Sequence, residues 1–167
     1  MPEVEDVTVS IPLVGRKPVI GLSLVPAQFL LSMPGGKAYI LGENGVVLAD
    51  ARKVGQKKQL GLQLLQEDVP LEVSVGHVIM TATDIAFLNT VTSELKKANL
   101  EVSRLQLPVG AGELHVHLKT EPYIIKFAFN GDARQQVGAF LALKSQLSST
   151  PPSSYVDVRI GERVYIK

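Results

Sequence analysis

An alternation of aliphatic and polar side chains over residues 155–167 constrains the fold of this chain more than any other feature. A period of two residues is typical of β-strands that bury one face and expose the other. The segment therefore predicts two strands joined by a turn at Gly161 and Glu162. The aliphatic residues of the two strands are Val156, Val158, Ile160, Val164 and Ile166.

The length of this turn decides which residues of the two strands lie opposite each other. A two-residue loop would place Ile160 opposite Arg163 and mix the apolar and polar faces, whereas a loop of about three residues keeps them separate. We expect the longer loop, because it buries Val164 and Ile166 together. The expected pairs are Ile160 with Val164, Val158 with Ile166, Asp157 with Lys167, and Arg159 with Tyr165.

The second of these strands is expected to be the edge of a sheet, since the sequence stops at Lys167. An edge carries a row of unpaired backbone N–H and C=O groups, which is either an aggregation hazard or a docking site. Arg and Tyr are frequent anchors at protein interfaces, so we expect this edge to bind a partner. The candidate partner-binding residues are Arg159, Ile160, Glu162, Arg163, Val164, Tyr165 and Lys167.

The composition indicates a globular protein and argues against several functions. With 167 residues, of which 46% are hydrophobic and 20% charged, the chain can bury a core. A net charge of +1, 5% aromatic residues and no Trp do not fit a nucleic-acid-binding protein. The absence of Cys excludes disulfides and thiolate sites. The apolar run at residues 18–33 is interrupted by Gly21, Pro26 and Gln28, and a membrane-spanning helix needs about 20 apolar residues.

The first half of the chain predicts mainly strands. Residues 4–11 and 18–25 form a β-hairpin pattern, which is marginally stable by itself. A change of composition at residues 32–36 separates this hairpin from a second one, whose tight turn is indicated by Asn44 and Gly45. We interpret residues 51–66 as a mobile loop or short helix, and residues 71–75 as a strand.

Apolar residues that recur every three or four positions predict two helices in the second half. The first contains Ile85, Leu88 and Val91 and begins with a cap at Thr83 or Asp84; the second follows a cap at residues 130–132. Three alternating segments, at residues 102–107, 114–118 and 125–129, predict strands between the helices. Runs of strands punctuated by two helices predict an α+β fold with a mainly antiparallel sheet and both helices on one face.

Taken in order, these elements make the chain resemble the extracytoplasmic region of the bacterial cell-division protein family FtsQ/DivIB. The motifs that carry the resemblance are Tyr39-Ile-Leu-Gly-Glu-Asn-Gly-Val-Val-Leu48, Tyr155-Val-Asp-Val-Arg159 and Arg163-Val-Tyr-Ile166. They are similar to the family's tyrosine-aliphatic-Asp-Glu-x-Gly hairpin, with Gly42 in place of the usual Asp, and to its closing Val-Asp-Leu-Arg hairpin. Residues 1–33 resemble the C-terminal fragment of a POTRA domain, and residues 34–167 resemble the β domain that follows it.

This resemblance implies a non-enzymatic scaffold domain of the divisome that binds partners of the FtsB and FtsL type. We expect docking by β-strand addition at the closing edge. Family members are single-pass proteins of the cell membrane with this region on the extracytoplasmic side, so we expect the anchor and the first half of the POTRA domain to lie outside this sequence. No cofactor is expected. An envelope assembly or secretion factor carrying a POTRA domain is the alternative within the same broad class.

The remaining candidate sites are weaker. His115 and His117 point to one side of a predicted strand, an arrangement that a small metal- or sugar-binding module could use. A third metal ligand would have to be a carboxylate such as Glu113. We therefore expect no metal. The sequence has no nucleophile elbow and only 3 His, so we expect no enzyme. One basic cluster offers contacts to anionic lipid or cell-wall polymer. Its residues are Arg52, Lys53, Lys57 and Lys58.

Overall fold

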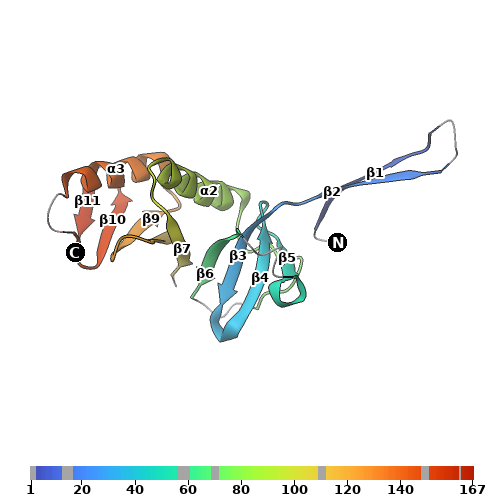
Figure 1. Ribbon diagram of the computed structural model, residues 1–167, viewed down its shortest axis with the longest axis horizontal. Helices are drawn as coiled ribbons and strands as arrows, with labels where there is room; N and C mark the ends of the chain where they lie inside the picture. The colour runs from blue at the N-terminus through green and yellow to red at the C-terminus, as the bar shows by residue number, and fades with distance from the viewer. Residues whose placement is uncertain are drawn as a thin grey trace.

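The computed structural model describes residues 3–12, 17–55, 61–68, 72–108, 112–147, 151–161 and 163–167. These residues form strands, two α-helices and short 3-10 turns (Figure 1). In chain order the elements are β1 (Val4–Ser10), β2 (Val19–Leu24), β3 (Ala27–Met33), η1 (Pro34–Gly36), β4 (Lys37–Gly42), β5 (Val47–Asp50), η2 (Ala51–Lys53), β6 (Gln63–Glu67), α2 (Ala82–Lys97), β7 (Val102–Leu107), β8 (Glu113–Leu118), β9 (Ile124–Ala128), α3 (Ala133–Gln146), β10 (Tyr155–Ile160) and β11 (Arg163–Ile166).

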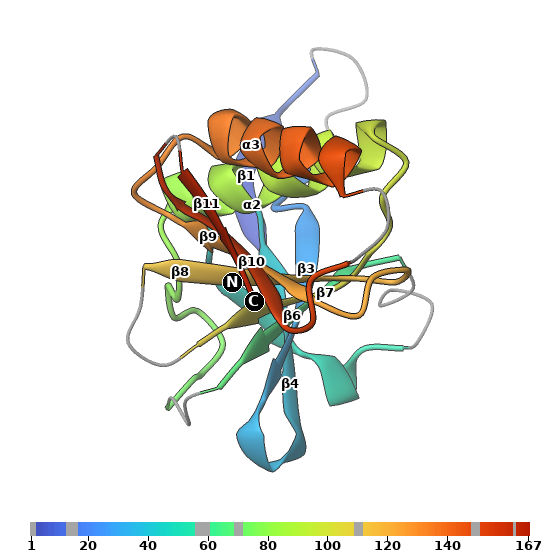
Figure 2. The ribbon, with the colours of Figure 1, turned by 90° about the vertical axis from the view of Figure 1, so that its left-hand side faces the viewer.

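The main sheet is 9-stranded, in the order β11-β10-β9-β8-β7-β6-β3-β4-β5. Neighbouring strands in this sheet run antiparallel, except for the pairs β9–β10, β3–β6 and β6–β7, which run parallel. Both helices lie on the same face of this sheet and pack against each other (Figures 1 and 2). The predicted α+β fold, with a mainly antiparallel sheet and two helices on one face, is therefore confirmed.

The core lies between the helices and this face of the sheet. The alternation of each central strand directs one set of aliphatic residues toward the helices, and full burial of such a side chain contributes roughly 1.5–3 kcal/mol. The rings of Phe87 and Phe129 meet at the margin of this core with centroids 5.1 Å apart. The residues that are 0% exposed include Leu88 and Val91 of α2, Phe140 of α3, and Leu105, Leu114, Val116, Ile125, Phe127, Val156 and Val158 of the strands.

Both helices begin at capped residues. The Thr81 hydroxyl accepts a hydrogen bond from Asp84 N (3.1 Å), while the Asp84 carboxylate accepts one from Thr81 N (3.0 Å). Thr81 is therefore the N-cap of α2, and the expectation of a cap at Thr83 or Asp84 is wrong, because Asp84 completes the capping box from inside the helix. Asp132 caps α3, as expected, by accepting from Gln135 N at 2.7 Å. Among the described residues, neither helix has the length and apolarity to cross a membrane.

Two secondary-structure predictions in the middle of the chain are wrong. Residues 63–67, expected in a loop or short helix, form β6, which lies between β3 and β7 in the main sheet. Residues 72–75, expected to be a strand, are irregular. The sequence of β6 contains no β-branched residue, so its strand conformation comes from its two parallel neighbours, between which Leu65 is fully buried.

The hairpin of β1 and β2 is confirmed and forms a separate 2-stranded sheet that projects away from the rest (Figure 1). The domain boundary expected between residues 33 and 34 does not coincide with this separation, because β3 pairs with β4 and β6 and buries Phe29, Leu31 and Met33. The two sheets separate between β2 and β3. The resemblance of the hairpin to a POTRA fragment stays a prediction.

Candidate interaction edge

β11 is one edge of the main sheet and pairs only with β10 among the described strands. The predicted register is wrong: Ile160 lies opposite Arg163, and Asp157 lies opposite Tyr165. Between these two pairs β10 advances by three residues and β11 by two, so β10 contains a bulge. The short turn, which begins at Gly161 (φ 53), therefore mixes the faces only at the pair Ile160–Arg163. Beyond the bulge, Asp157 lies opposite Tyr165 and Val156 lies opposite Ile166. Glu162, one of the candidate binding residues, lies outside the described residues.

The side chain of Asp157 supports this bulge. Its carboxylate accepts three hydrogen bonds from Arg159: from the backbone N at 3.1 Å, from Nε at 2.9 Å and from Nη2 at 2.6 Å. Asp157 is only 6% exposed. Burial by itself would raise the pKa of Asp157, but the hydrogen bonds from Arg159 outweigh it and lower the pKa. The carboxylate therefore stays ionised and keeps the bulged backbone in place.

The backbone of β11 points alternately toward β10 and away from the sheet. Tyr155 and Lys167 form a doubly hydrogen-bonded pair, and in an antiparallel ladder such pairs alternate with non-bonded ones. Tyr165, opposite Asp157, therefore directs its N–H and C=O toward β10. Val164 and Ile166 direct theirs outward, where a further strand would pair.

The side chains along this edge are partly apolar and exposed. Ile160 is 55% exposed, Tyr165 46% and Ile166 52%, and Arg163 and Lys167 are also exposed. Val164 is half-buried and packs against the main core. The predicted burial of Ile166 is wrong, because it lies near the end of the edge strand and no described strand covers it.

The opposite edge of the sheet, β5, is covered at its first residue. Val47 N donates to His77 O (2.9 Å), and Gly76 N donates to Val47 O (2.8 Å). Gly45 makes this approach possible: its φ is +77, and a Cβ there would lie 2.0 Å from Met80 O. In the part of the chain that the structure describes, β5 is thus partly covered, whereas β11 has no strand or loop bonded along its outer side.

Arg159, expected to be a free binding anchor, is held within the protein. Besides its bonds to Asp157, its Nη1 donates to Glu113 Oε1 on β8. β9 lies between β8 and β10, and its last residue, Ala128, is opposite Glu113. Arg159 therefore joins β8 to β10 and is not presented to a partner.

A row of polar residues crosses the helix-free face from β7 to β11. The pairing registers place His115 opposite Lys126, Lys126 opposite Asp157, and Asp157 opposite Tyr165. Lys126 Nζ also lies 4.2 Å from the centre of the Tyr155 ring, within cation–π range. Sequence reasoning did not single out Lys126 and paired Asp157 with Lys167, because the period-two alternation indicates a face but not which strands are neighbours.

The two histidines of β8 each contact a neighbour on this face. His115 Nε2 lies 3.3 Å from Glu113 Oε2, and His117 Nε2 lies 2.8 Å from Gln106 Oε1. Burial lowers the pKa of His115 more than the bond to Glu113 raises it, and burial likewise lowers the pKa of His117. The described residues contain no group of three or more His, Cys, Asp or Glu arranged to hold a metal ion.

The basic cluster is only partly described. Arg52 and Lys53 lie in η2, whereas Lys57 and Lys58 lie outside the described residues. Arg52 donates to Asp50 through Nε (3.0 Å) and Nη2 (2.7 Å), and this contact lowers the pKa of Asp50 to about 2. Arg52 is thus paired with Asp50 while its side chain stays exposed, and the contact to an anionic surface stays a prediction.

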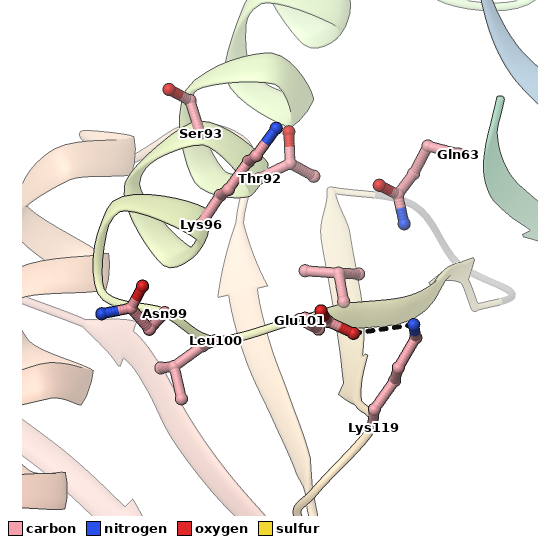
Figure 3. Close-up of a pocket in the computed structure, with 9 residues that line it drawn as sticks. Gln63, Thr92, Ser93, Lys96, Asn99, Leu100, Glu101 and Lys119 are labelled. Atoms are coloured by element: carbon pink, nitrogen blue, oxygen red, sulfur yellow. Dashed lines mark hydrogen bonds and ion pairs between the residues drawn. The ribbon is translucent and has the colours of Figure 1, made fainter. Parts of the chain in front are cut away.

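A cavity of about 800 Å³ lies between the C-terminal end of α2 and the first residues of β6 and β7 (Figure 3). Its walls include exposed Ser93, Lys96 and Asn99. Glu101 is paired with Lys119 at 2.7 Å, and this contact lowers the pKa of Glu101. Thr92, which also lines the cavity, donates its hydroxyl to Leu88 O (2.9 Å) within α2.

No protein-family model matches this chain, and no curated protein sequence matches it. Support for a function therefore comes from the geometry of β11 and from the sequence motifs.

Proposed function

We propose that this chain is a non-enzymatic scaffold domain of the bacterial divisome that binds a partner of the FtsB or FtsL type by β-strand addition to β11. The observation that carries this proposal is the uncovered edge, on which Val164 and Ile166 direct their backbone groups outward. The bonds of Val47 to Gly76 and His77, which cover the start of the β5 edge, support the choice of β11.

Backbone groups and side chains on this edge would have different roles in binding. Main-chain hydrogen bonds to the outward N–H and C=O groups would supply affinity. Arg163, Tyr165 and Lys167, which alternate with the outward-bonding residues, would select the partner by charge and shape. Tyr165 and the exposed Ile166 offer the aromatic and aliphatic surface that a docked strand can cover.

The resemblance to FtsQ/DivIB supplies the biological setting of the proposal. In that setting the domain lies on the extracytoplasmic side and reaches the cell membrane only through an anchor outside this sequence. Neither a cofactor nor nucleic acid takes part. The motifs at residues 39–48 and 155–166 support this assignment.

A peptide titration tests the proposal. The extracytoplasmic segment of an FtsB-type protein, and separately that of an FtsL-type protein, is titrated into the purified chain by calorimetry. Ile166→Pro removes an outward N–H and is expected to weaken binding by about tenfold or more, the equivalent of one main-chain hydrogen bond of about 1.4 kcal/mol. Ile166→Val keeps the N–H and the β-branched side chain, and should bind like the parent.

Both variants must show the circular dichroism spectrum of the parent. A parent chain that binds neither segment, or an Ile166→Pro variant that binds as tightly as Ile166→Val, would remove β-strand addition at β11 as the function.

A further inference from the structure

The edge strand is connected to a histidine three strands away. Along the helix-free face, His115 contacts Glu113, Glu113 contacts Arg159, and Arg159 holds Asp157, which lies opposite Tyr165 of β11. Every link is a hydrogen bond, an ion pair or a direct cross-strand pair. The chain of contacts therefore runs without a break from β8 to the edge.

The contact between Asp157 and Arg159 sets the register of the edge. The bulge in β10 falls between Asp157 and Ile160, and Arg159 N donates to the Asp157 carboxylate within it. We call the hydrogen bonds between Asp157 and Arg159 the clamp. If the clamp opens, Arg159 N in the bulge loses the Asp157 carboxylate as its acceptor. A one-residue change of register on β11 would exchange its inward and outward backbone groups.

His115 is the member of this chain of contacts that can gain a charge when the pH falls into the mildly acidic range. Its side chain is only 14% exposed, and Glu113 is shared between it and Arg159. Lys126 lies directly opposite His115 on β9. The titratable and charged groups around His115 are Glu113 and His117 on β8, Arg104 on β7, Lys126 on β9, and Asp157 and Arg159 on β10.

We propose that Glu113 and His115 are positioning residues that make the β11 edge sensitive to protons: protonation of His115 draws Glu113 away from Arg159 and loosens the bulge that fixes the register of β11. The inference rests on the proposed function only in calling β11 the docking edge. The change in the edge itself needs no partner to be measured.

The charges on this face give the direction of the effect. A proton on His115 places a second positive charge directly opposite Lys126, which then moves toward Asp157 and competes with Arg159 for its carboxylate. At the same time the charged imidazole binds Glu113 more strongly than the neutral ring does. Both changes weaken the hold on Arg159, so acid loosens the edge. Burial and the neighbouring cations lower the pKa of His115, which places the change below the ordinary histidine range.

Amide hydrogen exchange, followed by NMR on the whole chain, tests this directly. The inward amides of Tyr165 and Lys167 report the pairing of β11 with β10, and the Arg159 Nε–H signal reports the clamp. After correction for intrinsic exchange, the protection of both amides is expected to fall about tenfold between about pH 7.5 and about pH 5, which corresponds to one pKa unit of coupling.

The variants separate His115 from a general effect of acid. His115→Gln keeps a side-chain donor for Glu113 but cannot be charged, and should show protection independent of pH over this range. His117→Gln is the matched control: it lies on the same strand and face, bonds to Gln106 instead of Glu113, and should respond to acid like the parent. Glu113→Gln weakens the contact to Arg159 and should lower protection at both pH values.

The inference is overturned if protection in the parent does not change with pH, or if it falls equally in His115→Gln. If His115→Gln does not fold, the Glu113→Gln variant provides the test. Amide protection of β11 equal to that of the parent at the higher pH would then overturn the inference. A parallel titration with the FtsB-type segment should show the same pH dependence in affinity. No binding at either pH would refute the proposed function, while the exchange data would still decide this inference.

Discussion

Tyr155 and Lys167 exchange both of their backbone hydrogen bonds, with N–O distances of 3.2 and 3.1 Å. This pair fixes the direction of every backbone group on β11, because bonded and non-bonded pairs alternate along an antiparallel ladder. Tyr165 therefore bonds inward and Ile166 outward. The two neighbouring residues should respond in opposite ways to substitution by proline.

Tyr165→Pro is expected to destabilise the protein by about 1–3 kcal/mol, because it removes an inward donor and leaves a carbonyl of β10 unpaired. Ile166→Pro should cost less than about 1 kcal/mol, since proline is tolerated where the N–H of an edge strand faces solvent. Urea denaturation of the two variants measures the difference. Equal costs would mean that the inward and outward assignments are wrong.

Deleting residues 1–24 should leave the remaining chain with cooperative unfolding, because β1 and β2 form a sheet of their own. Deleting residues 1–33 should abolish it, because this change also removes β3 from between β6 and β4 and exposes Phe29 and Leu31. Thermal unfolding followed by circular dichroism distinguishes the two. Cooperative unfolding of the shorter chain would show that β3 is dispensable.

Phe140→Ala should lower the free energy of unfolding by about 3–5 kcal/mol through lost burial and a cavity. Phe140 is 0% exposed and lies on the face of α3 that covers the sheet. Gln135→Ala, at an exposed position of the same helix, is the control and should change stability by less than about 0.5 kcal/mol. Chemical denaturation of both variants gives the values; a cost below about 1 kcal/mol for Phe140→Ala would mean that α3 presents another face to the core.

Stability should fall as the pH drops below about 6.5, the ordinary pKa of histidine. The pKa values of His115 and His117 are lowered in the folded state, so the unfolded chain binds their protons first and acid favours unfolding. The stabilisation is complete above the ordinary pKa and is lost as the pH falls through the folded-state values. Urea denaturation of the parent across this range should show the decline, and the double variant His115→Gln/His117→Gln should flatten it.

Local patterns in the sequence were enough to predict much of the fold. Alternation over residues 102–107 and 114–118 predicted β7 and β8, and the spacing of Ile85, Leu88 and Val91 predicted α2. The Asn44–Gly45 turn and the Asp132 cap were also predicted. Each of these signals depends on residues a few positions apart, whose conformations are limited by their own side chains and backbone.

The edge was predicted less completely. The alternation at residues 155–167 gave two strands and the two faces of β11, but not its register. The register includes a bulge in β10, where Arg159 bonds to Asp157 and also contacts Glu113 of β8. The contact from Arg159 on β10 to Glu113 on β8 joins residues far apart in the sequence, so a local pattern cannot indicate it.

By itself, then, the sequence determined which segments are amphipathic and where most of them begin and end. Tertiary structure alone decided that residues 63–67 become β6, that the start of the β5 edge is covered by the segment containing Gly76 and His77, and that Arg159 is an internal clamp. The physical reason is that strand pairing and ion pairing join residues far apart in the chain. Their free energy depends on which partners the whole fold brings within hydrogen-bonding distance.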